Sequence, residues 1–337
     1  MADNLRHHLA RLTHRGFRAA FPLVRRLYYD VANQFGFGDL YTQETMLADR
    51  GRVDAYQAAI ERYVQEGDVV IDLGTGTGIL AFLAAARSPA RVYAIDHSTI
   101  LDVAKKVRDA NGLSRVELLQ VNSRKLELPE KVDVIIQEQM GHALFDEQMV
   151  ANVADLRDRL LKPGGKILPS QFELYLDPVQ LKEHYVVPFA WEQVIHGVDF
   201  STLADLEPAT TPDHRFKLLA QHEYDHFLCA SEPVLRCDLD TAEAGDLTRS
   251  FQFRRTVQTA GRVDGICVHF VARFDEEISI STSPFADRTC WRVPLLRVAA
   301  RHYEVGEVIE VALDAADLAD QRTWRWEVAP ATGTGGA

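Results

Sequence analysis

The stretch VVIDLGTGTG at positions 69–78 decides the fold, because it joins an apolar run to a loop of alternating glycines. Residues 69–73 include four hydrophobic side chains, three of them β-branched, which is typical of a buried strand. Gly74, Gly76 and Gly78 let the backbone pass close to a ligand at the carboxyl end of that strand. A helix is predicted to follow directly, over 79–87.

The spacing of the glycines indicates which ligand the loop binds. A dinucleotide-binding loop has G-x-G-x-x-G, and its third glycine would fall at Ile79. The observed G-x-G-x-G, preceded by Asp72, instead resembles motif I of class I methyltransferases. That resemblance implies a loop that holds the amino acid end of S-adenosylmethionine, which leaves as S-adenosylhomocysteine. The alternative interpretation of the glycines is a plain tight turn.

Asp96 ends the next predicted strand, eighteen residues after Gly78. A carboxylate there is placed to accept hydrogen bonds from both ribose hydroxyls of the cofactor. The alternative is an N-cap for the helix that follows, ahead of Ser98.

Apolar runs and helical spacing alternate along residues 53–168, which predicts a doubly wound, mostly parallel α/β sheet. From about residue 167 the sequence alternates polar and apolar residues between turns, which predicts an antiparallel β domain, with a helical segment over 185–206. The expected strands are 69–73, 91–96, 116–121 and 132–137, and the expected helices are 53–65, 79–87, 98–111 and 146–161, the last one ended by Lys162-Pro163-Gly164-Gly165.

An acidic loop, EQMGHALFDE at 138–147, follows the strand predicted over 132–137. Its two end glutamates, Glu138 and Glu147, and its Met140-Gly141 pair resemble the "double-E" loop of the protein arginine methyltransferases. That resemblance implies that both glutamates bind a guanidinium, with Met140 beside the substrate. The alternatives are that Glu147 begins the helix 146–161, or that the acids hold a metal, although no histidine cluster supports a metal site.

The chemistry of the guanidinium explains a pair of carboxylates. The group stays protonated and offers five N–H donors in a planar fork, which two carboxylates can bind and orient. The sulfonium of the cofactor is also positive, and two unit charges about 4 Å apart repel by about 4 kcal/mol at an effective dielectric constant of about 20. Two negative side chains offset this repulsion.

The resemblance extends over residues 25–327. It implies that Tyr28 and Tyr29 cover the substrate and that Trp291 lies beside it. It also implies that Arg52 binds the cofactor carboxylate and that Met46 packs near the sulfonium, the alternative for Met46 being ordinary core packing. Residues 197–201 resemble the helical arm through which family members dimerise. The implied division is N-terminal helices at 1–52, a Rossmann-like S-adenosylmethionine domain at 53–168, a β-barrel-like domain at 169–330 with its arm at about 185–210, and a flexible tail at 331–337.

Three departures from the family pattern concern the surroundings of the substrate and the adenine base. Cys290 replaces the histidine of a T-H-W triplet, and Ala32 replaces a second tyrosine of the aromatic motif. Arg124 stands where the family has an adenine-contacting glutamate, so base recognition is expected to depend on Ser123 or on backbone groups. Glu138 and Glu147 are unaffected by these changes.

Composition limits the class of protein. The formal net charge of −12 opposes a nucleic-acid surface and is compatible with a cationic substrate; the alternative is that the acidity only keeps the protein soluble. The sequence has neither an apolar run of about 20 residues nor a signal-peptide pattern, and its four cysteines show no C-x-x-C spacing. We therefore expect a cytoplasmic protein without a metal site and without a membrane span.

Three functional hypotheses follow. The altered entrance and the long link between Gly36 and Met46 favour free L-arginine or a small guanidino metabolite as the methyl acceptor. The alternative is methylation of arginine residues in proteins or peptides, and a remote one is a non-catalytic scaffold that binds cofactor. A homodimer is expected from the arm.

Overall fold

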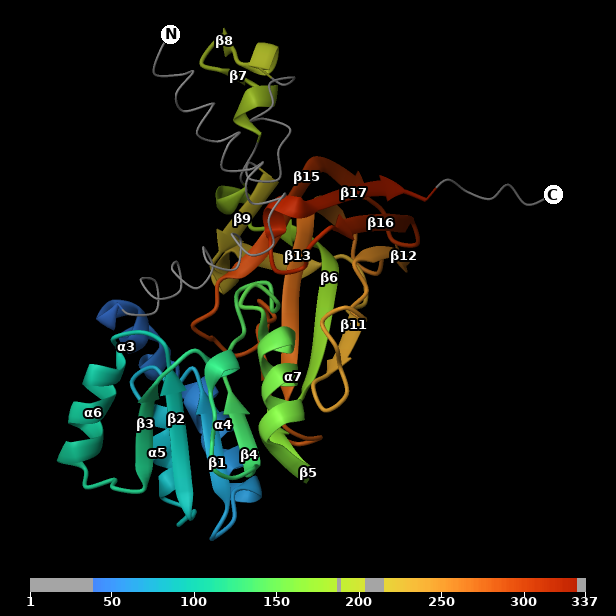
Figure 1. Ribbon diagram of the computed structural model, residues 1–337. Helices are drawn as coiled ribbons and strands as arrows, with labels where there is room; N and C mark the ends of the chain where they lie inside the picture. Colours follow the sequence, from blue (N-terminus) through green and yellow to red (C-terminus); the bar gives the residue numbers. More distant parts are fainter. Residues whose placement is uncertain (1–38, 187–188, 204–214, 332–337) are drawn as a thin grey trace, which may run out of the picture.

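The computed structural model describes residues 39–186, 189–203 and 215–331. Five parallel strands form the first sheet in the order β3-β2-β1-β4-β5 (Figure 1). The four strands predicted up to residue 137 are confirmed. The elements of this part are α3 (Leu40–Ala48), α4 (Arg50–Tyr63), β1 (Val69–Leu73), α5 (Ile79–Ala85), β2 (Arg91–Asp96), α6 (Leu101–Ala110), β3 (Val116–Gln120), β4 (Val132–Gln137), α7 (Met149–Leu160) and β5 (Leu161–Leu168).

The strand order places the glycine loop and the acidic loop side by side at one edge of the sheet. The chain moves from β1 outward to β2 and β3, then returns to the other side of β1 for β4 and β5. Ligands of such sheets bind beyond the carboxyl ends of the strands where the order reverses, which here is between β1 and β4. The glycine loop follows β1 and the acidic loop follows β4, so both lie at this reversal.

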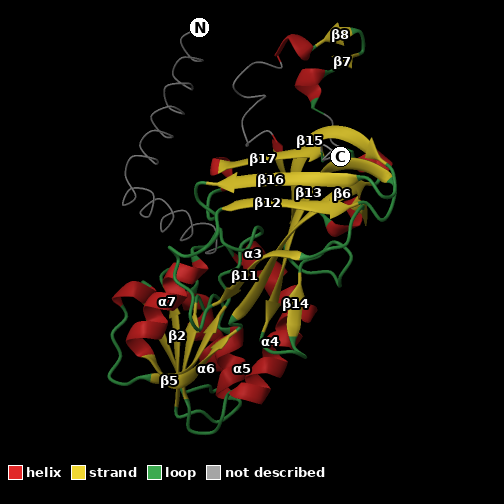
Figure 2. Cartoon of the chain, turned by 90° about the vertical axis from the view of Figure 1, so that its right-hand side faces the viewer, coloured by secondary structure: helices red, strands yellow, loops and turns green. Residues whose placement is uncertain are grey.

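Two larger antiparallel sheets, as predicted, and one two-strand hairpin make up the described residues that follow the parallel sheet (Figure 2). The larger sheet is built on the long strands β6 and β13, which pair over nine residue positions. Its strands are β6 (Gln171–Leu181), β9 (Phe216–Leu219), β10 (Tyr224–Phe227), β11 (Pro233–Asp238), β13 (Gly261–Arg273), β14 (Ser279–Ser281) and β15 (Val293–Tyr303), and the smaller sheet has β12 (Ser250–Thr256), β16 (Val308–Ala315) and β17 (Trp324–Pro330).

One hydrophobic core connects the parallel sheet with the antiparallel part. Tyr56 of α4 packs edge-on against Phe274, which follows β13, with ring centroids 4.9 Å apart. The Tyr56 hydroxyl donates to the carbonyl of Gln137 at the end of β4. The core includes residues on both sides of positions 168 and 169, so it does not mark a domain boundary there. The predicted boundary at 168/169 stays a prediction.

The prediction of a helix over 185–206 is wrong for the residues that the structure describes there. A two-strand hairpin, β7 (Val194–Ile195) and β8 (Val198–Asp199), lies between short 3-10 turns at the far end of the molecule from the parallel sheet (Figure 1). His196 and Gly197 both have positive φ, 48° and 81°. Two such residues form the tight turn that joins β-branched strand residues, so the local sequence favours a hairpin.

The last Rossmann helix also begins later than predicted. Gln148 has φ of 56°, so the helix α7 starts at Met149 and Glu147 stands in the loop before it. The helix ends at Leu160, and Lys162 to Gly165 lie within β5 rather than in a helix cap. Glu147 is therefore not a helix-starting residue, which removes the structural alternative raised for it.

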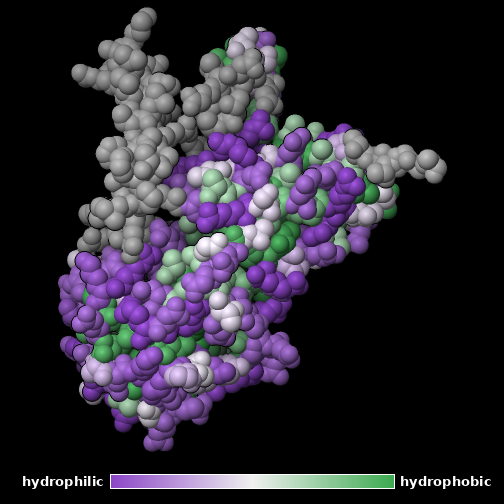
Figure 3. Space-filling view, turned by 45° about the vertical axis from the view of Figure 1, so that its right-hand side comes forward, coloured by the Kyte–Doolittle hydropathy of each residue, from purple (hydrophilic) through white to green (hydrophobic). Residues whose placement is uncertain are grey.

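The surface that Figure 3 shows is mainly hydrophilic, with small hydrophobic patches. Of the helices that the structure describes, none is both long enough and apolar enough to cross a bilayer. Among the same residues, no group of three or more His, Cys, Asp or Glu side chains is placed to hold a metal ion.

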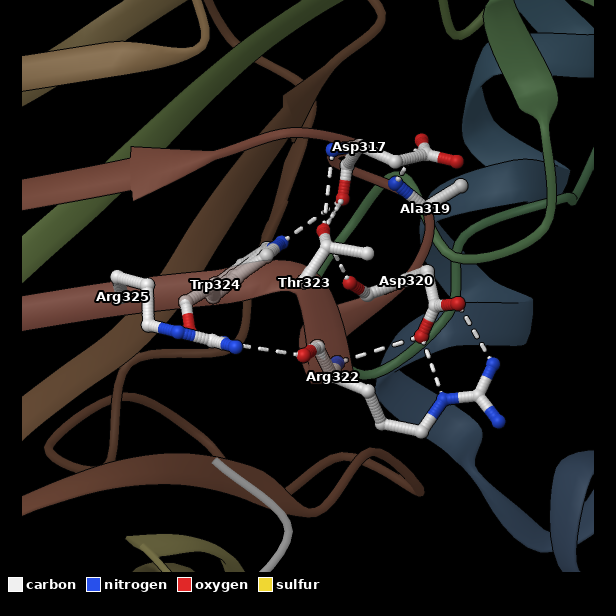
Figure 4. A network of polar contacts seen from close by, with 7 residues as sticks. All are labelled: Asp317, Ala319, Asp320, Arg322, Thr323, Trp324 and Arg325. Atoms are coloured by element: carbon white, nitrogen blue, oxygen red, sulfur yellow. Dashed lines mark hydrogen bonds and ion pairs between the residues drawn. The ribbon is translucent and has the colours of Figure 1, made fainter. Parts of the chain in front are cut away.

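A polar cluster at the start of β17 gives a test of the fold (Figure 4). The Thr323 hydroxyl accepts the N–H of Asp317 at 3.0 Å and lies 2.7 Å from the carbonyl oxygen of Asp320, to which it donates. The indole of Trp324 donates to the carbonyl of Asp317 at 3.0 Å. The cluster thus closes the loop 317–323 over a buried tryptophan.

We expect Thr323→Val to lower the free energy of unfolding by about 1–3 kcal/mol, because partly buried backbone groups lose their partners. Urea denaturation measures this loss. The matched control is Thr241→Val at an exposed position, which should change the free energy of unfolding by less than about 0.5 kcal/mol. Equal effects of the two substitutions would contradict the role of the Thr323 hydroxyl.

Candidate active site

A cavity of about 640 Å³ opens at the carboxyl ends of β1 and β4, between the parallel sheet, α3 and the loop before β15. It is where most of the residues predicted from the sequence meet. The predicted residues that line it are Met46, Arg52, Gly74, Gly76, Asp96, Glu138, Met140, Glu147 and Trp291. Asp72 and Gly78 lie outside its lining, Ser123 lines a smaller adjoining cavity, and Tyr28 and Tyr29 fall outside the described residues.

The glycine loop needs its glycines. Gly74, Gly76 and Gly78 have φ of 74°, 55° and 96°, a region that other residues rarely adopt. A Cβ atom on Gly76 would also lie 2.7 Å from the side-chain oxygen of Gln43.

Asp96 accepts the N–H of Gly76 at 3.1 Å and the N–H of Ser98 at 2.8 Å. Asp96 therefore shapes the turn after β2 and still lines the cavity, but it is not the N-cap considered as its alternative role, because the N-cap of α6 is Ile100.

Two buried polar atoms near the loop fit the zwitterionic end of the cofactor. Asp72 accepts the hydroxyl of Thr75 and the N–H of Ala81 with one oxygen, and its other oxygen has no partner in the part of the chain described. Arg52 likewise keeps a buried Nε–H without a hydrogen-bond partner there. A negative group beneath the loop and a positive group at the cavity wall suit an ammonium and a carboxylate, respectively.

The pKa of Asp72 gives this fit a measurable consequence. Burial raises it to about 7, although Thr75 and Ala81 favour the ionised form. The cationic cofactor binds better to the charged carboxylate, so affinity for S-adenosylmethionine should increase as Asp72 loses its proton. We expect the Kd to be severalfold lower at pH 8 than at pH 6 by calorimetry.

Asp72→Asn is the control for that measurement. The variant has no proton to lose at this position, so its Kd should be nearly constant between pH 6 and pH 8. The same pH dependence in the variant and in the natural protein would show that another group is responsible.

Arg52 joins the cofactor end of the cavity to the acidic loop. Its Nη1 lies 2.6 Å from Oε2 of Glu138, and its Nη2 donates to the carbonyl of Met46 at 2.8 Å. Its backbone N–H is capped by Asp49, where α4 begins. Burial raises the pKa of Glu138, and the adjacent Arg52 opposes this effect. Glu138 is thus an oriented carboxylate.

Glu147 is the second acid and has a different environment. Its pKa lies well above the ordinary value because the side chain is buried and because Glu138 and Asp146 lie nearby. Asp146 was not singled out from the sequence. Its carboxylate accepts the N–H of Ala143 at 3.1 Å, and burial raises its pKa to about 6. A bound cation would offset the mutual repulsion of these acids, so the loop favours a positively charged ligand.

The loop before β15 closes the cavity from the antiparallel part. Backbone N–H of Cys290 donates to Oδ2 of Asp49 at 2.6 Å, and the buried Trp291 donates its indole N–H to the carbonyl of Met140 at 2.7 Å. The N–H of Arg292 donates to Nδ1 of His142 at 3.1 Å. Sequence reasoning missed His142, and its place between the two glutamates was the only signal that could have found it.

The adjoining cavity, about 50 Å³, holds the residues expected near the adenine base. Arg124 donates from Nε and Nη2 to the side-chain oxygen of Asn152 at 3.0 and 2.8 Å. Asn152 in turn donates to Gln139 at 3.2 Å. Arg124 therefore binds to α7, and Ser123 lines the adjoining cavity, where its role in base recognition stays a prediction.

A parallel sheet whose glycine loop and acidic loop frame one cavity defines a class I methyltransferase, an enzyme that uses S-adenosylmethionine. The methyltransferase domain family matches residues 65–210. Protein arginine N-methyltransferase 6 of Danio rerio is 32% identical over 286 residues, which cover 80% of this chain and 78% of that protein. The chain belongs to the protein arginine N-methyltransferase family.

Further comparisons agree with this assignment. "Probable protein arginine N-methyltransferase 6" of Arabidopsis thaliana is 41% identical over 181 residues, 53% of this chain, and the match spans 42% of that protein. Arabidopsis thaliana protein arginine methyltransferase 10 superposes with a TM-score of 0.70 and 26% identity over 87% of this chain and 93% of its own. The Trypanosoma brucei PRMT1 enzyme–prozyme complex with AdoHcy has the same fold, with a TM-score of 0.76 and 24% identity over 89% and 95% of the two chains.

These comparisons confirm the predicted fold class, enzyme class and cofactor. The relatives are named as protein arginine methyltransferases. They give no support to the expectation of free arginine as substrate, and they favour the alternative of arginine in proteins.

Proposed function

We propose that this enzyme methylates a terminal guanidino nitrogen of arginine residues in proteins or peptides. The observation that carries the proposal is the pair Glu138 and Glu147, two acids on one loop that share a cavity with the glycine loop. This replaces free arginine, the substrate expected first, because the relatives support the protein-bound form.

Charge explains how the chain would carry out the reaction. When bound, S-adenosylmethionine supplies an electrophilic methyl group on a cationic sulfonium. Glu138 and Glu147 bind the guanidinium fork, offset the repulsion between two cations, and hold one terminal nitrogen at the attack position. Arg52 fixes Glu138, so the orientation of the fork is set before the substrate arrives. The protonated product loses its extra proton afterwards, so no strong base is required.

The cofactor would be held by residues from three elements. Gly74, Gly76 and Gly78 let the backbone approach its amino acid end, with Asp72 beneath and Arg52 beside it. We assign the ribose hydroxyls to Asp96 and the base to the cavity of Ser123. Met46 and Met140 line the same cavity, and we assign them to contacts with the sulfonium and with the substrate, respectively.

Mass spectrometry of products tests the proposed substrate. An arginine-rich peptide and free L-arginine are incubated with cofactor in parallel, and we expect methylarginine in the peptide at much higher yield. Methylation of free arginine alone would overturn the protein-bound substrate and restore the small-molecule hypothesis. Absence of methylation in both, with cofactor bound, would overturn the assigned reaction.

We also propose a homodimer formed through the β7–β8 hairpin. Val194 and Val198 are 64% and 57% exposed, and Trp191 and Ile195 are 37% exposed, so the arm carries an apolar surface.

The four free cysteines suit a cytoplasmic location.

Val198→Glu should convert the dimer to a monomer in sedimentation velocity experiments, because a charge would be buried at the contact. Val305→Glu, at another exposed valine, serves as the control and should sediment as the natural protein does. A natural protein that sediments as a monomer at micromolar concentration would overturn the dimer.

A further inference from the structure

His142 occupies the middle of the acidic loop, four residues after Glu138 and five before Glu147. It lines the cavity and is partly exposed there. Among the residues that the structure describes, the imidazole has one hydrogen-bond partner: its Nδ1 accepts the backbone N–H of Arg292 at 3.1 Å. The ring therefore has a fixed position between the acidic loop and the loop before β15.

The hydrogen bond to Nδ1 also fixes the tautomer. A nitrogen that accepts an N–H carries no proton itself, so in the neutral ring the proton is on Nε2. Burial and the nearby Arg292 lower the pKa of His142, which keeps the ring neutral near pH 7. None of the described residues forms a hydrogen bond with Nε2. This nitrogen is also absent from the side-chain atoms that are buried without a hydrogen-bond partner, so it is accessible. His142 thus offers one accessible N–H donor to the cavity.

The donor is of the wrong kind for a guanidinium. A guanidinium has only N–H donors, which the carboxylates of Glu138 and Glu147 can accept and which His142 Nε2–H cannot. The group that suits His142 is an oxygen acceptor on the same substrate. Arg292, whose backbone is bonded to the ring and which also lines the cavity, adds positive charge on that side.

We propose that His142 Nε2–H binds a main-chain oxygen of the substrate arginine. The oxygen is a carbonyl when the arginine is in a protein and a carboxylate when it is free. This inference rests on the proposed function, because it takes the guanidinium to be bound by the two glutamates. His142 then recognises the part of the substrate that does not react.

Three small substrates test the inference. N-acetyl-arginine N-methylamide presents carbonyl oxygens, free L-arginine presents a carboxylate, and agmatine has the same guanidino chain with no main-chain oxygen. KM is measured for each, or an inhibition constant where turnover is too slow. Comparing the N-methylamide with free L-arginine shows whether His142 binds a carbonyl oxygen or a carboxylate oxygen.

His142→Asn is the informative variant. The asparagine side-chain oxygen can still accept the Arg292 N–H, whereas the distal donor is lost. We expect KM for the N-methylamide to rise by about 3–10-fold with kcat unchanged, as for one hydrogen bond, and the value for agmatine to stay the same. His302→Asn, at a position with an exposed side chain, controls for the substitution itself.

The outcomes separate the two proposals. An unchanged KM for both oxygen-bearing compounds, or an equal rise for agmatine, would overturn the role of His142 while leaving guanidine methylation intact. A rise for free arginine alone would assign the contact to a carboxylate. If no compound and no arginine-rich peptide is methylated, it is the proposed function that fails.

Discussion

Glu147→Gln is expected to lower kcat by about 10²–10³-fold, the range measured when one preorganised electrostatic partner of a transition state is removed. Glutamine keeps the shape of the side chain and loses its charge. The guanidinium would then face the sulfonium with only Glu138 to offset the repulsion, and the fork would lose its second carboxylate. Transfer of a labelled methyl group to an arginine-rich peptide at saturating cofactor measures the change.

Two further measurements separate this effect from misfolding. Burial and neighbouring acids raise the pKa of Glu147 in the folded state. Above the pKa of the unfolded state, the raised folded-state pKa therefore lowers the free energy of unfolding. Glutamine carries no such cost, so thermal stability at pH 7 should be equal or higher in the variant. Glu127→Gln, at an exposed position, should keep full activity. A kcat within threefold of the natural value would remove Glu147 from the mechanism.

The parts of the fold that depend on local sequence were predictable. The strand 69–73 and its loop are specified by β-branched residues followed by glycines, and the structure requires positive φ at all three glycines. The hairpin at 194–199 is equally local, and the prediction of a helical arm there overlooks the β-branched residues around His196-Gly197. The turn chemistry was the signal to follow there.

The contacts that shape the site are separated along the chain, and residue patterns do not reveal them. Arg52 and Glu138 are 86 residues apart, and Trp291 and Met140 are 151 apart. Family resemblance predicts that each of these residues lies near the site, and it implies one partner for Arg52, the cofactor. The structure gives it a second partner, which changes what its removal should do.

Arg52→Ala is expected to weaken cofactor binding and to destabilise the protein together. The Kd for S-adenosylhomocysteine should rise by about 100-fold through loss of a charge-assisted contact with the carboxylate, measured by calorimetry. Glu138, whose side chain is 14% exposed, would lose its ion-pair partner. Breaking a buried pair from one side costs about 3–5 kcal/mol, which urea denaturation would detect. Arg50→Ala, at the exposed start of the same helix, is the control.

The destabilisation by Arg52→Ala should depend on pH in a defined direction. Without Arg52, burial raises the folded-state pKa of Glu138 further, and the unpaired carboxylate can take up a proton. The added cost is therefore absent below the unfolded pKa of about 4.3 and grows as the pH rises toward the folded value. We expect a larger loss of stability at pH 8 than at pH 5. Combining Arg52→Ala with Glu138→Gln should restore stability but not cofactor affinity; failure to restore it would show that Arg52 stabilises the fold through contacts other than Glu138.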